Sequence, residues 1–147
     1  MLLGVQGFLS AQEYEFPDKI DDNFIFFKST DNKIHVLNKS VDYVFEKGKW
    51  TKNILKFRSS KRDSLVLFHK KGFNNLNFKA ISSEDNTYLV LSGGGPVLQY
   101  KNDSIVRIDN SVEQKNQFGA ASFVYKNNIY MYGGYGMWSF KNYTTYY

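Results

Sequence analysis

The sequence predicts an all-β fold, and its composition gives the first two reasons. Among the 147 residues, Phe occurs 13 times and Tyr 11 times, whereas Ala occurs only four times. Aromatic and β-branched side chains fit the pleated surface of a sheet, and the 11 glycines and 14 asparagines favour tight turns. The third reason is periodicity, because short apolar or alternating runs end at turn residues and lack the spacing of a helix. We therefore expect four-stranded antiparallel units and less than about 10% helix.

The predicted strands follow one another at short intervals along the whole chain. In the first half they cover residues 23–29, 33–37, 41–46, a run from Trp50, 54–58 and 64–69. In the second half they cover residues 78–82, 87–92, 97–101, 104–108, 118–125, 129–132 and 137–143. Asn127 and Asn128 predict a tight hairpin between Tyr125 and Ile129, with positive φ at one or both asparagines.

The chain contains an internal repeat. Residues 86–94 (NTYLVLSGG) resemble residues 127–134 (NNIYMYGG), and the two copies begin 41 positions apart. A weaker copy without the glycine pair begins at Asn32. Four short strands in each interval of about 40–50 residues match the period of a β-propeller blade.

The C-terminal copy resembles a kelch repeat. It has a small-residue strand (FGAASFVY, 118–125), a turn, an Ile-Tyr strand with a glycine pair (NNIYMYGGYG, 127–136) and a later aromatic residue, Trp138. The resemblance implies kelch-type blades at about 23–58, 64–108 and 117–147. Its structural motif residues here are Tyr88, Gly93, Gly94, Tyr130, Gly133, Gly134 and Trp138. The glycines are expected where the chain leaves an inner strand at positive φ, and Tyr130 and Trp138 between neighbouring blades.

The number of repeats predicts a partial propeller. Propellers close with about four to eight blades, and this sequence holds roughly three. Residues 13–147 are therefore expected to form part of a longer kelch-type propeller that needs further blades or self-association to close. A complete small β-domain is the alternative.

The first twelve residues, MLLGVQGFLSAQ, carry no charge and end in small residues. This pattern is typical of the second half of a secretory signal peptide, although a first strand or a tail remains the alternative. The interpretation predicts an exported protein, which is secreted, periplasmic or on the cell surface, like the exported bacterial kelch proteins that it resembles.

Several kinds of chemistry are excluded or unsupported by the residues present. The absence of cysteine excludes disulfides, thiolate zinc sites and a cysteine nucleophile. With only His35 and His69, a multi-histidine metal site is not expected, and both are interpreted as structural. Residues 92–96 (SGGGP) lack the spacing of a phosphate-binding loop. We therefore predict no catalytic residue, no cofactor and no metal.

Two regions are candidate binding sites. Tyr135 and Trp138 belong to an aromatic-rich end that would stack on a sugar or anchor a protein, with packing between blades as the alternative. Arg58 and Arg62 belong to a basic stretch, with a solvated surface as the alternative. Nucleic acid is not expected as a partner because the net charge is only +5. The sequence contains no run of 18 apolar residues, so a transmembrane helix is not expected.

The predicted function is that of a non-catalytic kelch-type interaction module, which binds protein or glycan through the loops of its blades. This prediction rests on the family resemblance, since a fold does not fix a function. The alternative is the N-terminal part of a propeller enzyme that acts on carbohydrate, in the manner of an epimerase, with catalytic residues beyond Tyr147. A third hypothesis is that the chain is the sensor portion of a larger membrane-associated regulator.

Overall fold

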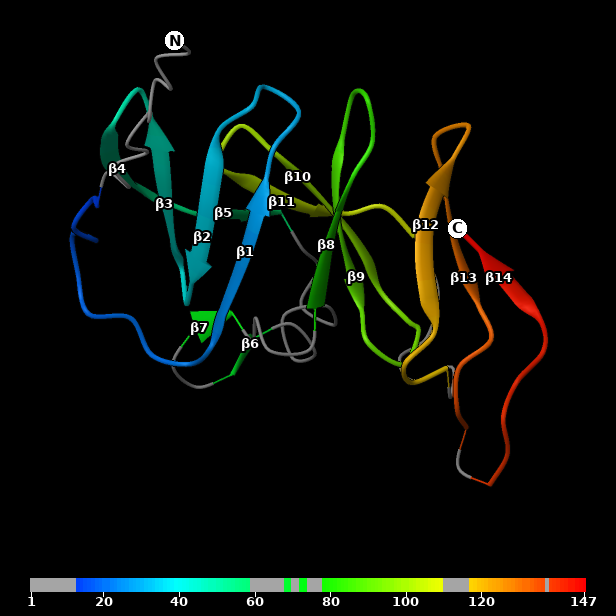
Figure 1. The fold of residues 1–147 in the computed structure, drawn as a ribbon. Coiled ribbons are helices and arrows are strands. Elements are labelled where there is room, and N and C mark those ends of the chain that lie inside the picture. The colour runs from blue at the N-terminus through cyan, green and yellow to red at the C-terminus, as the bar shows by residue number, and fades with distance from the viewer. Residues whose placement is uncertain (1–12, 59–67, 70–71, 74–77, 110–116, 137) are drawn as a thin grey trace, which may run out of the picture.

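The computed structural model describes residues 13–58, 68–69, 72–73, 78–109, 117–136 and 138–147. These residues form strands and turns without a helix, which confirms the all-β prediction. The strands build three sheets of four, five and three strands and one small two-stranded sheet (Figure 1). Residues 1–12, the predicted signal-peptide remnant, lie outside the described residues.

The first sheet is an antiparallel meander in the order β1-β2-β3-β4. Its strands are β1 (Phe24–Lys28), β2 (Ile34–Asn38), β3 (Val41–Glu46) and β4 (Lys49–Ile54). Each strand matches a run predicted from the sequence to within about two residues. This sheet is the four-stranded antiparallel unit that the sequence predicts.

The second sheet adds a fifth strand to a second meander. Its strands are β8 (Phe78–Ser82), β9 (Thr87–Leu91), β10 (Val97–Lys101), β11 (Ser104–Arg107) and β5 (Lys56–Arg58). β5 follows β4 after one residue, yet it pairs in parallel with β11 at the edge of the second sheet. The predicted run 54–58 is therefore divided between two sheets, because the chain crosses from one to the other at Leu55.

The third sheet has three strands, β12 (Ala121–Tyr125), β13 (Asn128–Tyr132) and β14 (Thr144–Tyr146). The predicted strand 137–143 is not formed by the described residues of that interval, which make only a bridge between Tyr135 and Phe140. The strand begins at Thr144 instead. Of the run predicted at 64–69, the structure describes β6 (Phe68–His69), which pairs with β7 (Gly72–Phe73).

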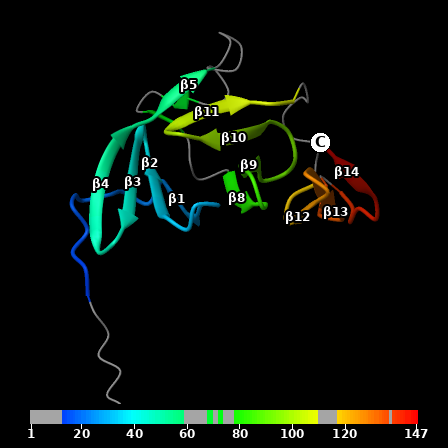
Figure 2. The same cartoon turned by 90° about the horizontal axis from the view of Figure 1, so that it is seen from above.

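The three sheets stand in a row and fan outwards from their first strands. Seen from above, β1, β8 and β12 lie on the inner side of the row (Figure 2). β1 contacts β8, and β8 contacts β12. The Ser82 hydroxyl in β8 donates a hydrogen bond of 2.8 Å to the carbonyl of Lys28 in β1. Each sheet therefore packs through a face against the next sheet along the chain.

β9 explains how the middle sheet holds both neighbours. Its sequence TYLVL is buried at every position. Because side chains alternate across a strand, Leu89 and Leu91 join the core shared with the first sheet, and Tyr88 and Val90 join the core shared with the third. The first core includes Ile25, Phe27, Leu37, Leu98 and Ile105; the second includes Val97, Ala120, Ile129 and Met131.

Two-residue turns close three of the hairpins with positive φ at both positions. They are Lys47-Gly48, Asn102-Asp103 and Lys126-Asn127, as expected for turns that match the twist of paired strands. The predicted hairpin after Tyr125 is confirmed, and Asn127 has a φ of 61°. The turn lies one residue earlier than predicted, since Asn128 already pairs with Tyr125 in the ladder.

Both glycine pairs have left-handed backbones. Gly93 and Gly94 have φ of 96° and 80°, and Gly133 and Gly134 have φ of 70° and 93°. A Cβ on Gly93 would meet the ring of Phe118 at 2.6 Å, and one on Gly134 would meet the Gln117 backbone at 2.8 Å. The glycines thus permit the chain that enters the third sheet to cross directly beside them.

Residues 13–22 form a strap along the outer flank of the first sheet. The Phe16 ring packs on Tyr43 and Trp50, and Tyr14 packs on Phe45. Asp18 accepts hydrogen bonds from Tyr43 and Lys52.

At the other end of the strap, hydrogen bonds from Lys39 and secondly from Asn38 lower the pKa of the Asp21 carboxyl to about 2. Phe24 and Phe26, on the same flank, remain exposed.

The aromatic side chains of the third sheet differ from the sequence prediction. Trp138 does not lie between sheets but is 89% exposed. The reason is that Gly136 and Ser139 close a turn, which carries Trp138 on a loop outside the ladder. Tyr130 lies on the outward face, where its ring stacks on Phe123 with centroids 5.5 Å apart. By contrast, Tyr88 is buried between the second and third sheets.

Candidate functional site

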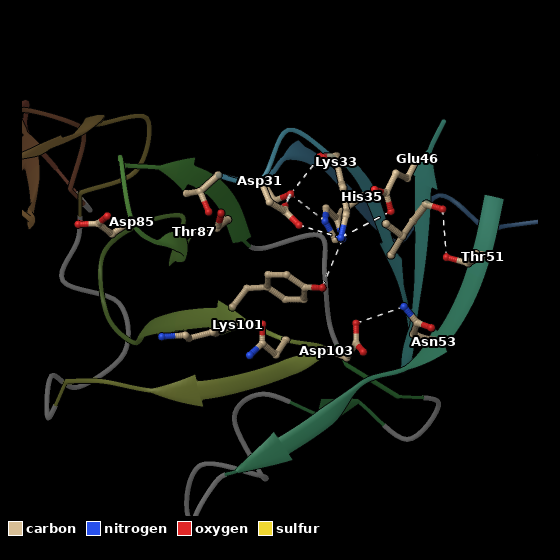
Figure 3. Close-up of a pocket in the computed structure, with 15 residues that line it drawn as sticks. Asp31, Lys33, His35, Glu46, Thr51, Asn53, Asp85, Thr87, Lys101 and Asp103 are labelled. Atoms are coloured by element: carbon tan, nitrogen blue, oxygen red, sulfur yellow. Dashed lines mark hydrogen bonds and ion pairs between the residues drawn. The ribbon is translucent and has the colours of Figure 1, made fainter. Parts of the chain in front are cut away.

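A polar cleft of about 440 Å³ opens between the first and second sheets (Figure 3). It lies on the side of these two sheets where the β1–β2, β3–β4, β8–β9 and β10–β11 turns are found. The lining residues are Ser29, Thr30, Asp31, Lys33, His35, Val44, Glu46, Thr51, Asn53, Asp85, Thr87, Tyr100, Lys101, Asn102 and Asp103. Most carry a hydroxyl, amide, carboxylate or amine, so the cleft is equipped to bind a polar ligand.

A buried hydrogen-bond network forms the inner wall of the cleft. His35 Nδ1 lies 3.0 and 3.1 Å from the two carboxylate oxygens of Asp42, and Tyr100 donates a hydrogen bond of 2.5 Å to Asp42 Oδ2. His35 and Asp42 belong to the first sheet and Tyr100 to the second. The side chain of Asp42 is fully buried. The network therefore ties the two sheets together and fixes the width of the cleft between them.

Aromatic packing holds this network from behind. The Phe27 ring stacks on the His35 ring with centroids 5.0 Å apart and an interplanar angle of 7°. Tyr100 meets both rings edge on. Because these apolar contacts exclude water, the hydrogen bonds to Asp42 act in a region of low dielectric and are strengthened.

Ser29 extends the network to the rim of the cleft. Its Oγ lies 3.0 Å from His35 Nε2, so that Ser29, His35 and Asp42 follow one another as in a serine hydrolase. However, the same hydroxyl donates to Asp31 Oδ1 at 2.5 Å. Since a hydroxyl has a single proton, His35 is not its acceptor in this arrangement. The geometry favours a role for Ser29 in holding the β1–β2 turn.

The local sequence explains why these side chains meet. The register of the first sheet pairs Phe27 with His35 and His35 with Val44, and Asp42 lies on the same face two residues before Val44. In the second sheet, Tyr100 is the second-last residue of β10, close to the Asn102-Asp103 turn, and the Asn53 amide donates to Asp103 at 3.2 Å. Strand alternation and a tight turn thus place the wall and the rim together.

The rim carries charges of both signs with an excess of carboxylates. Lys33 lies 2.9 Å from Asp31 and 3.6 Å from Glu46. Hydrogen bonds, first from Ser29 and then from Lys33, hold the pKa of Asp31 below its ordinary value. Asp85 and Asp103 add two carboxylates on the second sheet, and Lys101 is the one basic side chain among the described residues of that sheet that line the cleft. The rim is therefore acidic, although the whole chain has a net charge of +5.

We expect the protein to lose stability above about pH 10, in part because of Tyr100. Burial, and secondly the hydrogen bond to Asp42, raise the pKa of the Tyr100 hydroxyl. The folded protein therefore retains a proton that the unfolded chain releases as the pH rises, so the contribution is complete below pH 10 and decreases above it. The pKa values of Tyr43 and Tyr147 are also raised. Urea titrations from pH 8 to 11 should show a shallower decline for Tyr100→Phe; an equal decline would contradict the role of Tyr100.

The structure does not bring the sequence-predicted binding residues together. Tyr135 packs edge on against Phe140, and Trp138 stands on the loop beyond it. Arg58 is exposed at the end of β5 on another sheet, and Arg62 lies outside the described residues. Tyr135, Trp138 and Arg58 do not line the cleft. Phe57, the neighbour of Arg58 in β5, packs against the first core.

Sequence reasoning missed the cleft and its wall. It interpreted His35 as a structural histidine and did not single out Asp42, Asp85 or Tyr100. One signal was available, since His35 and Asp42 fall on buried-looking positions of adjacent predicted strands. The partner from the second sheet had no signal, because 65 residues separate Tyr100 from His35.

The described part of the chain contains no group of three or more His, Asp or Glu residues that would hold a metal ion. No helix long and apolar enough to cross a membrane is found among the described residues. In comparisons with known proteins, no family model matches the chain and no curated protein sequence matches it. The site must therefore be interpreted from its own geometry.

Proposed function

We propose that this chain is a kelch-type binding module of an exported protein, and that it binds a protein ligand at the cleft between its first two sheets. The propeller assignment is supported by three successive sheets whose first strands, β1, β8 and β12, lie side by side. It is also supported by the left-handed glycine pairs after β9 and β13. Each feature is expected of blades arranged around an axis.

The observation that carries the binding role is the composition of the cleft. Its described lining combines two lysines, four carboxylates, and several hydroxyls and amides, and Tyr100 is the only Phe, Tyr or Trp among those described residues. Tyr100 is 7% exposed and lies edge on to Phe27 and His35, so it offers no open ring face to a sugar. These features favour a charged protein segment over a glycan, and the excess of carboxylates favours one with basic side chains.

A titration followed by amide NMR tests this proposal. The probes are a hexa-arginine peptide, a hexa-glutamate peptide and a set of neutral oligosaccharides. We expect the basic peptide to shift the amide signals of residues 29–35, 46–53 and 100–103. Substitution of Glu46 and Asp85 by Gln and Asn should weaken that binding about fivefold to tenfold, since two partly exposed charge contacts are removed.

Trp138→Ala is the matched control, because Trp138 is exposed and far from the cleft. It should leave peptide binding unchanged. Oligosaccharide binding that disappears in Trp138→Ala but persists in the cleft variant would contradict the proposal and place a glycan site on the aromatic loop. Shifts that are equal for both peptides, or absent at the cleft, would also contradict it.

A further inference from the structure

Two aromatic surfaces lie at opposite ends of the row of sheets. The head surface is formed by Phe24 and Phe26 on β1, which are 44% and 61% exposed. The tail surface is the outward face of the third sheet, and all of its aromatic members are on strands. They are Phe123, Tyr125, Tyr130, Tyr132 and Tyr146. Exposed apolar patches of this kind mark sites of association.

The packing inside the chain shows what each surface fits. The first sheet turns one face to the second sheet, and the second turns its far face to the third. The inner contacts proceed from β1 to β8 and from β8 to β12. If this succession continues after β12, the next sheet must pack its own first strand, with exposed apolar side chains, against the tail surface. β1 of another copy is such a strand.

We infer that copies of the chain associate head to tail, with the tail surface of one copy packed against the head surface of a second copy. This inference rests on the order of the sheets that supports the proposed propeller, and it does not depend on the ligand of the cleft. Leaving out the small two-stranded sheet, two copies would contribute six sheets, which falls within the range of about four to eight blades in closed propellers. A head-to-tail contact of this kind closes into a ring when the rotation between copies permits it.

Ring geometry at the tail surface favours a protein occupant over a sugar. The rings of Phe123 and Tyr130 are nearly parallel, with an interplanar angle of 12° and centroids 5.5 Å apart. Their faces are therefore turned towards each other, whereas a sugar stacks on an open ring face. Side chains that stand on edge instead offer grooves into which other side chains fit.

Charge favours head-to-tail pairing over pairing of two tail surfaces. Residues 118–147 contain two lysines and no Asp or Glu, so two tail surfaces would bring like charges together. The strap beside the head surface contains five carboxylates and one lysine. Of these carboxylates, Glu13, Glu15 and Asp22 form no ion pair among the described residues, and they are available to Lys126 or Lys141 of another copy.

Sedimentation velocity of two complementary variants tests the inference. Phe26→Glu blocks the head surface and Tyr125→Glu blocks the tail surface, both at exposed positions. We expect the parent chain to be associated and each variant alone to be monomeric. An equimolar mixture should form a one-to-one dimer, because the intact tail of Phe26→Glu meets the intact head of Tyr125→Glu. Ile108→Glu, at an exposed position directly after β11 of the middle sheet, should associate like the parent.

Several results would overturn the inference. A parent chain that remains monomeric at 100 µM (roughly a hundred times a micromolar Kd) excludes it. Association that survives Phe26→Glu but not Tyr125→Glu shows pairing of two tail surfaces instead. Zero-length carbodiimide cross-linking of the unmodified parent gives a second measurement if a variant fails to fold. Intermolecular links should join Lys126 or Lys141 to residues 13–22, and their absence in an associated sample would contradict the arrangement.

Discussion

Replacement of His35 by alanine is expected to lower the free energy of unfolding by about 3–5 kcal/mol. The physical reason is that Asp42, which is fully buried, would lose the ring nitrogen that contacts both of its carboxylate oxygens and retain only the hydrogen bond from Tyr100. A buried carboxylate left with incomplete hydrogen bonding costs far more than a neutral group in the same place. Loss of the ring that stacks on Phe27 adds to the effect.

Urea unfolding of the variant and of a matched control measures this effect. Lys33→Ala, two residues away on the cleft rim, removes surface ion pairs with Asp31 and Glu46 and should cost less than about 1 kcal/mol. If His35→Ala were as mild as Lys33→Ala, the network would not be the stabilising contact between the first two sheets. Because these sheets form the walls of the cleft, His35→Ala should also abolish peptide binding.

Gly134→Val is expected to be the second most damaging substitution, with a loss of about 3 kcal/mol. Two independent costs combine at this position. The φ of 93° disfavours any side chain, and a Cβ would approach the Gln117 backbone to 2.8 Å. Gln117 cannot move freely, because its side-chain Nε2 donates to the carbonyl of Gly133 and its side-chain Oε1 accepts from the Thr145 hydroxyl.

Gly119 supplies the control for this prediction. It has a φ of 70°, but a Cβ there would meet no atom within 4 Å. Gly119→Val should therefore show only the conformational cost, of about 1 kcal/mol. Thermal unfolding of the two variants compares them directly. Equal losses at both positions would mean that the close approach of Gln117 to Gly134 does not exist in solution.

Local features of the fold were predictable from the sequence because their causes are local. Alternation in VDYVFE and the short apolar run TYLVL indicated strands, and Asn127 indicated a hairpin. The error of one residue in that turn arose because Lys126 also adopts positive φ, a conformation that lysine enters less readily than asparagine. Similarly, the glycine pairs signalled left-handed backbone at Gly93 and Gly134, but not the crossing chain that requires it.

Features that depend on distant residues were not predictable. Nothing near Lys56 indicates that β5 leaves the first sheet to pair with β11, because the partner lies about 50 residues away. The same is true of the hydrogen bond between Asp42 and Tyr100, whose two residues lie 58 positions apart on different sheets. Trp138 was misplaced because its motif position suggested packing, whereas the Gly136–Ser139 turn directs it to solvent.

The contact between Asp42 and Tyr100 underlies both the joining of the first two sheets and the shape of the cleft, and a double-mutant cycle tests it most directly. The free energies of unfolding of Asp42→Asn, Tyr100→Phe and the double variant would be measured in urea at pH 7. Side chains in direct contact within one network should show a coupling energy of about 1–3 kcal/mol. Additive effects, with a coupling below about 0.5 kcal/mol, would show that the two sheets do not meet at these residues and would contradict the proposed site.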